Sequence, residues 1–305
     1  MELANNFTLE KFNPEVLREY DIRGVVNENL TTNTAYSIGR TFGHVVCSKF
    51  AKKKIAVGYD GRLTSPSLHH ALCKGLLDSG ANVFSIGICT TPMTYFAHYH
   101  LQTDAAVMVT GSHNPPEYNG FKMVLDNHSF FADAIQNLQM LTELKNISQG
   151  TGQLINIDIT KEYVNRNLQN IHLEKKMKIA WDIGNGTVGT VIDKFTQQLS
   201  KSEHIVINKE VDGTFPNHHP DPTVPENMKQ LIETVLTNSC DIGLAFDGDG
   251  DRLGVIDNKG QIIWADQYML LLAKESSTLY QNPKIIMDVK SSKVFFEEVK
   301  KFNCD

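Results

Sequence analysis

The chain has 305 residues, enough for two domains and part of a third. A net charge of −6 with no long basic run argues against a nucleic-acid surface, and no stretch approaches the roughly 20 apolar residues of a membrane span. The five cysteines are scattered without a C-x-x-C pair, and the N-terminus has no signal-peptide pattern. We therefore expect reduced thiols and a cytoplasmic protein.

Short apolar strands alternate with helical patterns along the chain. We expect strands at 54–59, 82–86, 105–110, 178–183, 204–208, 241–246 and 284–289. We expect helices at 32–50, 66–79, 131–145, 188–199, 225–238, 267–279 and 292–302. Such alternation implies crossover connections, so the fold class is α/β and multidomain, each domain having a mixed or parallel sheet with helices on both faces.

Two turn-rich segments suggest the domain boundaries. The clearest linker is the run at 148–153, and a second turn sequence lies at 258–260. We therefore expect domains at 1–157, 158–260 and 261–305. Within the last of these, the strand at 284–289 and the helix at 292–302 form only the opening of another α/β unit, so we expect it to be the incomplete start of a third domain, in a shortened chain or a natural remnant.

The strand expected at 105–110 leads into a turn that is unusually rich in functional groups. It contains Ser112 and His113, and Lys122 follows within the same run. A turn at the carboxyl edge of a strand is a common place for chemistry in open α/β folds. A phosphorylated serine needs cationic and donor neighbours, because phosphate carries about two negative charges. An ordinary polar turn is the alternative, but the density of functional groups favours a site.

A glycine run at 184–189 follows the strand expected at 178–183. It fits the G-x-G-x-x-G pattern, and Glu210 lies about 20 residues further on, as in dinucleotide-binding folds. A dinucleotide-dependent oxidoreductase is therefore one alternative function. Glycines are also needed where a strand packs tightly on a helix, and this structural interpretation is the one that we prefer.

The strand expected at 241–246 ends in three aspartates, Asp247, Asp249 and Asp251. The intervening glycines let the backbone curl so that all three carboxylates can meet one cation. Ligand sets made only of oxygen favour magnesium, which commonly leaves positions free for a substrate phosphate. The strand followed by D-x-D also fits phosphotransferases of the haloacid-dehalogenase type, with Asp247 as the nucleophile, and this alternative stays open.

These runs resemble the α-D-phosphohexomutases, and most closely the bacterial phosphomannomutase/phosphoglucomutase group. The matching segments are 20–24, 110–122, 182–189 and 247–252, with further similarity at Arg62, 215–222 and 288–290. The resemblance covers essentially the whole chain, but only two of the four family domains and the start of the third. The sugar-recognition loop of the third domain and the phosphate-gripping loop of the fourth are not in this sequence, so the preference between mannose and glucose stays open.

The resemblance implies a reaction and a role for each site residue. Ser112 is implied as the phosphoserine, with one Mg²⁺ held by its phosphate and the three aspartates. The other residues implied at the site are Arg23, His113, Lys122 and Arg252 around the transferred group, and Tyr20 and Lys290 at the substrate. The implied reaction converts hexose 6-phosphate to hexose 1-phosphate through a sugar bisphosphate, in a monomer or weak dimer that needs neither nucleic acid nor membrane.

Two points within this interpretation remain open. The general base is His113 or Lys122, with Lys122 slightly preferred. We also expect this chain to turn over at least about a hundredfold more slowly than a four-domain enzyme, because lost orientation is expensive in rate. A sugar-phosphate-binding remnant without catalysis is the corresponding alternative.

Overall fold

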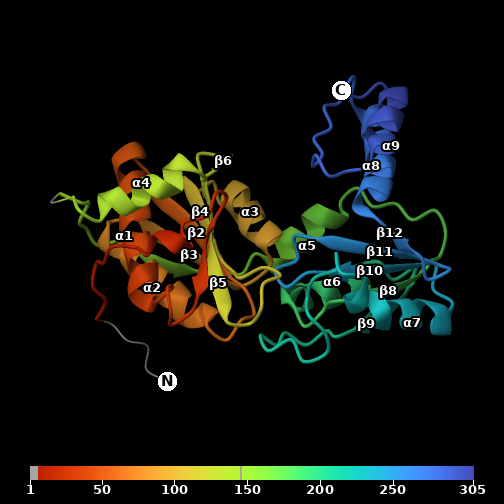
Figure 1. The fold of residues 1–305 in the computed structure, drawn as a ribbon, viewed down its shortest axis with the longest axis horizontal. Helices are drawn as coiled ribbons and strands as arrows, with labels where there is room; N and C mark the ends of the chain where they lie inside the picture. The colour runs from red at the N-terminus through yellow and green to blue at the C-terminus, as the bar shows by residue number, and fades with distance from the viewer. Residues whose placement is uncertain (1–5, 145) are drawn as a thin grey trace.

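The computed structural model describes residues 6–144 and 146–305, which form two α/β lobes (Figure 1). The first lobe contains β1 (Ile22–Val25), β2 (Lys54–Tyr59), β3 (Asn82–Ile88), β4 (Ala105–Val109), β5 (Tyr118–Leu125), β6 (His128–Ser129) and β7 (Leu154–Asn156). Its helices are α1 (Thr32–Lys49), α2 (Ser65–Asp78), α3 (Thr91–His100) and α4 (Asp133–Leu141), with a short 3₁₀ helix at Pro14–Val16.

The first sheet has the order β1-β5-β4-β2-β3-β7, with β6 paired to β5. Strands β4, β2, β3 and β7 run parallel, whereas β5 is antiparallel to both β1 and β4. Alternate residues of β2 serve opposite faces, because side chains alternate along a strand. Ile55 and Val57 pack in the core with α1, α2 and α4, and Ala56 packs in the core that includes α3.

The second lobe contains β8 (Lys178–Asp182), β9 (Glu203–Ile207), β10 (Ile242–Phe246), β11 (Leu253–Asp257) and β12 (Ile262–Ile263). Its helices are α5 (Thr160–Leu168), α6 (Ile192–Gln198) and α7 (Lys229–Asn238), with 3₁₀ helices at Thr187–Thr190 and Pro225–Met228. The sheet order is β12-β11-β10-β8-β9, with β10, β8 and β9 parallel and β11 antiparallel to its two neighbours. Both sheets are mixed, as the fold class predicted.

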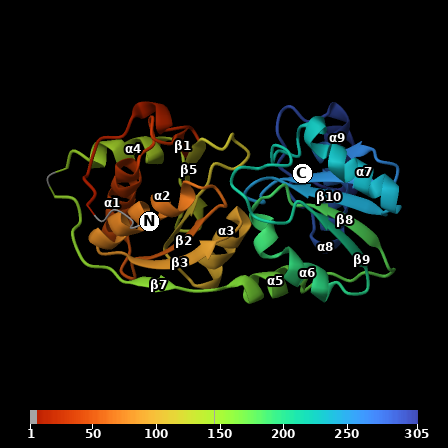
Figure 2. The same ribbon diagram turned by 90° about the horizontal axis from the view of Figure 1, so that it is seen from below.

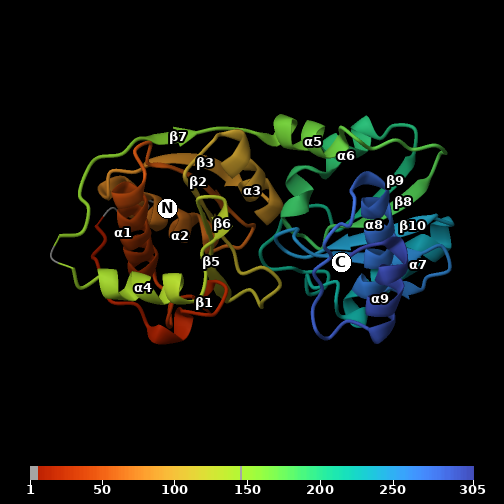
Figure 3. The same cartoon turned by 90° about the horizontal axis from the view of Figure 1, so that it is seen from above.

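The two lobes share a buried core. Met93 and Ala97 of α3 lie in one apolar cluster with Val164 of α5 and Ile192 of α6. The second sheet buries its other face against α7, where Ala180 and Ala245 meet Leu231 and Val235. Figures 2 and 3 show the chain running from β7 along one side of the molecule into α5, with α3 on the side of the first lobe that faces the second. This packing fixes the carboxyl ends of β4 and β10 relative to each other.

Several expectations need correction. Part of the run at 110–122, which reads as a turn in the sequence, is strand β5, and Arg23 lies in strand β1. The segment 284–289 is not a strand, because within the described residues it pairs with no other strand, and the amide of Ile285 instead donates to the carbonyl of Asp305. The helix expected at 131–145 ends at Leu141, and Lys145 lies outside the described residues.

Helix α8 (Ala265–Leu279) is close to its expected range, and the last predicted helix is split into α9 (Lys293–Glu298) and a 3₁₀ turn at Val299–Phe302. These elements project from the second lobe and form a separate small apolar cluster (Figure 1). Each of the five cysteines is a free thiol, as expected. Among the helices of 6–144 and 146–305, none is long and apolar enough to cross a membrane.

Candidate active site

Ser112 lies at the end of β4, where the buried strand opens into the serine loop (residues 110–118). Its side chain is only 2% exposed, and its backbone adopts a left-handed conformation with φ of +53°. A non-glycine residue in this conformation carries strain that the surrounding structure must support. The amide of Ser112 donates to Thr110 Oγ1 at 2.7 Å, which is part of that support.

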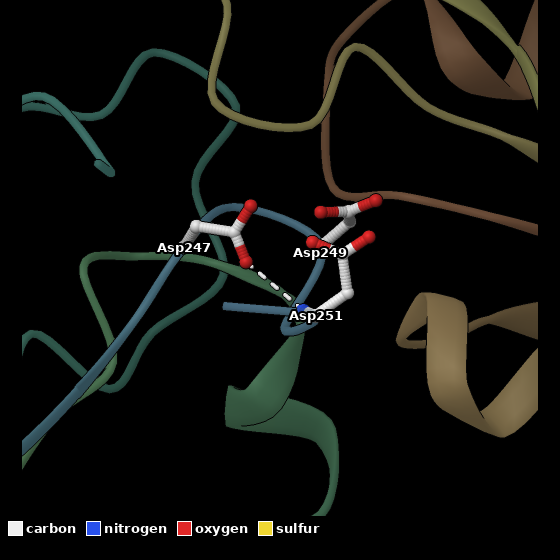
Figure 4. A group of neighbouring side chains, drawn as sticks. All are labelled: Asp247, Asp249 and Asp251. Atoms are coloured by element: carbon white, nitrogen blue, oxygen red, sulfur yellow. Dashed lines mark hydrogen bonds between the residues drawn. The ribbon is translucent and has the colours of Figure 1, made fainter. Parts of the chain in front are cut away.

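The three aspartates form the Asp loop (residues 247–252) after β10. Asp247 Oδ1 accepts hydrogen bonds from the amides of Asp251 and Arg252, at 2.9 and 3.0 Å, and the first of these bonds is visible in Figure 4. Asp249 is fully buried, and its Oδ2 accepts from the hydroxyl of Thr91 at 2.6 Å. Thr91 begins α3 in the first lobe, so the two lobes meet at this carboxylate.

The serine loop and the Asp loop touch directly. Ser112 Oγ donates to Asp247 Oδ2 across 3.2 Å, although the two residues follow strands of different sheets. Lys122 of β5 reaches over from the first lobe and donates to Asp249 Oδ2 at 2.7 Å and to Asp251 Oδ2 at 2.6 Å. One ammonium group thus neutralises part of a concentrated negative charge.

His113 completes a chain of hydrogen bonds that ends at Asp247. Its Nδ1 lies 3.2 Å from Ser112 Oγ, and its Nε2 lies 3.4 Å from an Arg252 guanidinium nitrogen. A guanidinium can only donate, so Nε2 accepts, and in the neutral ring Nδ1 carries the proton and donates to Ser112 Oγ. Burial, and next the positive charge of Arg252, lower the pKa of His113, which favours the neutral ring.

The charges of the Asp loop and Lys122 shift one another. Burial, followed by the charges of Asp249 and Asp251, raises the pKa of Asp247. Burial opposes ionisation of Asp249, but the charge and hydrogen bond of Lys122 outweigh it and lower that pKa. Burial likewise opposes the charged form of Lys122, yet the two carboxylates outweigh it and raise the pKa of Lys122. Lys122 therefore holds its proton firmly in this arrangement.

The serine loop, Lys122 and the end of the Asp loop at Asp251 and Arg252 border one pocket of about 510 Å³. The residues that line it are Arg18, Tyr20, Asp21, Arg23, Ser112, His113, Asn114, Tyr118, Lys122, Asp251 and Arg252. Arg23 is oriented by Asp21 and by Asn114 Oδ1, which it meets at 3.2 Å. Arg252 lies near Asp221, with 3.6 Å between the charged atoms. The pocket therefore combines three hydroxyl groups, four cationic side chains and an acidic edge.

The Asp loop is able to hold a metal ion. One carboxylate oxygen from each of Asp247, Asp249 and Asp251 lies within 4.8 Å of the others. Asp249 Oδ1 is buried and has no hydrogen-bond partner among the residues that the structure describes. Such an atom is costly unless a donor or cation meets it. The hard oxygen donors suit magnesium in particular.

Comparisons with known proteins match most of the chain to one family. Residues 14–147 match phosphoglucomutase/phosphomannomutase α/β/α domain I, and residues 161–260 match domain II of the same family. A phosphomannomutase/phosphoglucomutase of Pseudomonas aeruginosa is 43% identical over 91% of this chain and 60% of the relative. A phosphoglucomutase of Neisseria meningitidis is 42% identical over 94% of this chain and 62% of the relative.

The chain belongs to the α-D-phosphohexomutase family. It is also similar to a crystal structure of a phosphoglucomutase/phosphomannomutase family protein from Burkholderia thailandensis, with a TM-score of 0.91 and 37% identity over 96% of this chain and 66% of that one. The chain spans about 60% of the length of the curated phosphohexomutase relatives it matches.

Within this phosphohexomutase chain, the glycine run packs against the Asp loop. A Cβ at Gly186 would lie 2.9 Å from the carbonyl oxygen of Gly248, and one at Gly189 would lie 2.2 Å from that of Lys209. The amide of Thr187 also donates to the carbonyl of Gly248. These contacts favour the structural interpretation of the run over the dinucleotide alternative.

One predicted site residue lies elsewhere in the structure. Lys290 borders a different pocket, beside Trp264 and Asp266 of the α8 region, and its side chain is 85% exposed. The strand that we expected to position Lys290 does not form, so its substrate role stays a prediction.

Sequence reasoning gave no role to four residues of the site or its support, although Arg62 was among the positions similar to the family. Arg18 lines the pocket, Thr91 holds Asp249, and Asp60 and Arg62 lie beneath the serine loop. Asp60 and Arg62 directly follow β2, which neighbours β4, so their position at the same sheet edge was a usable signal. Thr91 lies just before Pro92 at a helix start, but nothing in that pattern indicates a contact with Asp249.

Proposed function

We propose that this chain carries the phosphoserine and the magnesium site of a phosphohexomutase, an isomerase that interconverts hexose 6-phosphate and hexose 1-phosphate. The observation that carries the proposal is the 3.2 Å contact between Ser112 Oγ and Asp247 Oδ2, which joins the two loops from separate lobes. The relatives' names, phosphomannomutase and phosphoglucomutase, support hexose phosphates as substrates. The five free thiols support the cytoplasmic location that we expect.

In this proposal the phosphoryl group is carried by Ser112 Oγ. The bond between phosphorus and Ser112 breaks as a bond to a sugar hydroxyl oxygen forms, and that hydroxyl loses its proton to a base. The resulting sugar bisphosphate turns round and returns its other phosphoryl group to Ser112, which leaves the isomeric monophosphate. Phosphoryl transfer of this kind depends mainly on positioning and on neutralising charge.

The residues around Ser112 suit these tasks. Arg23 and Arg252 present fixed donor forks to phosphate oxygens in the pocket, and Tyr20 stands at its edge. Asp247, Asp249 and Asp251, with the Ser112 phosphate, would hold a magnesium ion that neutralises phosphoryl oxygens when bound. Because Lys122 holds its proton and His113 favours its neutral form, the arrangement favours His113 over Lys122 as the base.

The alternative with Asp247 as nucleophile has less support. Its Oδ1 accepts two backbone hydrogen bonds and its Oδ2 accepts from Ser112, so both oxygens already have partners. The side chain is fully buried, and the residue is not among those described as lining the pocket. Ser112, by contrast, borders the pocket directly.

An intact-mass measurement tests the proposal. The protein is incubated with magnesium and glucose 1,6-bisphosphate, and the modified residue is mapped by peptide fragmentation. We expect a gain of about 80 Da on Ser112. Phosphate mapped to Asp247 would support the dehalogenase-type alternative, and sugar-phosphate binding without any phosphoform would support a non-catalytic binding protein.

A further inference from the structure

The strongest feature that the proposed function does not use is Arg62, which lies beneath the serine loop. Its side chain is only 1% exposed, and all five of its guanidinium hydrogens have acceptors. Nε donates to Asp60 Oδ2 at 3.2 Å. The other four donate to backbone carbonyls of the serine loop, those of Ser112 (2.8 Å), Asn114 (2.6 Å), Pro115 (2.5 Å) and Tyr118 (3.1 Å).

Asp60 holds the other side of the same loop. Its Oδ2 accepts from the hydroxyl of Thr110 at 2.8 Å and from the amide of Gly111 at 3.0 Å. Its Oδ1 accepts from the amide of Arg62 at 3.1 Å and from the hydroxyl of Ser65. Asp60 therefore accepts hydrogen bonds from the donors of the loop, and Arg62 donates to its carbonyls. Together the two side chains provide partners for both kinds of polar group in the loop.

The packing leaves Arg62 little freedom to move. A Cβ at Gly111 would lie 2.4 Å from Arg62 Nε, so the glycine lets the loop backbone approach the guanidinium closely. The ring of Phe215, from the second lobe, lies 5.4 Å from Arg62 Cζ. Arg62 is thus enclosed by the loop on one side and by an aromatic ring on another.

We propose that Arg62, with Asp60, is a positioning residue that holds the serine loop in the strained conformation directing Ser112 Oγ at Asp247. Arg62 is not among the described pocket-lining residues and acts through the loop backbone, which it grips at the carbonyl of Ser112 itself. The consequence for phosphoryl transfer rests on the proposed function. The claim that Arg62 holds the loop is independent of that function, because it follows from the hydrogen bonds alone.

The test compares Arg62→Lys with a matched control, Arg40→Lys. A lysine keeps the charge but offers three donors on one nitrogen, which cannot span four carbonyls. Arg40, on α1 in the same lobe, also donates to a backbone carbonyl, that of Ser148 at 2.9 Å, but lies away from the pocket. Asp60→Asn serves as a second variant, because it keeps the shape of the side chain and removes its charge.

Two measurements are made on each variant: hydrogen–deuterium exchange of the peptide that spans 110–118, and the rate of Ser112 phosphorylation by glucose 1,6-bisphosphate. For Arg62→Lys we expect faster exchange in that peptide and a maximal phosphorylation rate roughly 10- to 100-fold lower, because a misplacement of about 1 Å can cost this much. The donor concentration at half-maximal rate should be unchanged. Arg40→Lys should change neither the exchange nor the rate.

The two proposals fail in different ways. If the wild-type protein shows no phosphate on Ser112, the proposed function fails, and the exchange arm alone decides whether Arg62 holds the loop. Unchanged exchange in Arg62→Lys, or a normal rate despite faster exchange, overturns the positioning role. The same holds if Arg40→Lys loses as much rate. If Arg62→Lys does not fold, Asp60→Asn decides by the same criteria, and unfolding of both variants would assign the pair to stability and overturn the proposal.

Discussion

The serine loop and the Asp loop both follow a buried parallel strand, yet they are supported in different ways. The serine loop is held within its own lobe, by Asp60, Arg62 and Thr110. Among the three aspartate side chains of the Asp loop, only that of Asp247 accepts hydrogen bonds from backbone amides of the same lobe within the described residues. Asp249 and Asp251 depend on Thr91 and Lys122, which come from the other lobe.

This difference follows from charge. The serine loop turns backbone amides and carbonyls toward the interior. The ion pair of Asp60 and Arg62, which has no net charge, supplies hydrogen-bond partners for them. The Asp loop concentrates three carboxylates and has no cationic side chain within itself except Arg252, which turns toward His113 and Asp221. Like charges this close require an external cation or donor. We therefore expect the serine loop to be rigid by itself and the Asp loop to respond to changes in the first lobe.

The substitution Ser112→Ala should distinguish the roles of the two loops most clearly. We expect complete loss of the phosphoform, while magnesium affinity changes little, because the three carboxylates remain. The variant should stay folded and lose about 1 kcal/mol, the usual value of one hydrogen bond. Intact mass, isothermal calorimetry with magnesium and urea unfolding give the three results. A normal gain of about 80 Da in the alanine variant would exclude Ser112 as the carrier.

Asp249→Asn tests the other loop. The asparagine keeps the shape of the side chain but removes a hard anionic metal ligand. We expect magnesium affinity to fall by more than about a hundredfold, which exceeds the usual loss when a residue that only contacts a metal ligand is changed. Phosphorylation of Ser112 should slow in parallel. Calorimetry measures the first effect and timed intact mass the second. The control is Asp193→Asn, an exposed carboxylate of the same lobe; equal affinities in both variants would require a different metal site.

Much of this arrangement could be predicted from the sequence. The strands expected at 105–110 and 241–246 placed Ser112 and Asp247 at strand ends. Both strands form in the structure, as β4 and β10. The positions of Ser112, His113, Lys122 and Arg252 around one pocket were expected, and the structure brings them together with Arg23 and Tyr20.

The rest could not be predicted, for identifiable physical reasons. Thr91 and Asp249 lie 158 residues apart, and no local pattern records a hydrogen bond across that separation. β5 carries Lys122 but begins inside a run that reads as a turn, because Pro115 and Pro116 precede it. The apolar run at 284–289 reads as a strand, yet a strand also needs a partner. The domain divisions after residues 157 and 260 stay predictions.

Thr91→Val probes the link between the lobes directly. The valine keeps the size of the side chain but removes the hydroxyl that donates to Asp249 Oδ2. Outer-sphere partners of metal ligands typically contribute 10- to 100-fold to affinity, so we expect magnesium to bind about tenfold more weakly. Calorimetry gives the affinity, and exchange of the peptide that spans 110–118 should be unchanged.

The matched control is Thr94→Val on the same helix. Thr94 is equally buried, but its hydroxyl contacts Met108 and Cys89 and not the Asp loop. If Thr94→Val weakens magnesium binding as much as Thr91→Val, the effect comes from general loosening of α3. The Asp loop would then not depend on the specific contact from the first lobe.

The smallest expected effect concerns the support of the second lobe and its pH dependence. His218 places Nε2 3.0 Å from Asp182 Oδ2 and Nδ1 3.0 Å from the carbonyl of His219, so both ring nitrogens face acceptors. Burial opposes the charged ring, but the hydrogen bond and charge of Asp182 outweigh it and raise the pKa of His218 above 6.5. The imidazolium is therefore the form that the folded protein favours.

A raised folded-state pKa fixes the sign of the effect. The stabilisation by His218 is fully present below the unfolded pKa of about 6.5 and is lost as pH rises through the higher folded value. We expect His218→Gln to lower the free energy of unfolding most at about pH 6 and least near pH 9, by about 1 kcal/mol, the usual net value of one hydrogen bond. Urea unfolding at both pH values gives the difference, with the exposed His172→Gln as control. An effect of His218→Gln that grows toward pH 9 would contradict a charged His218, and the support of this lobe would then not involve the ion pair with Asp182.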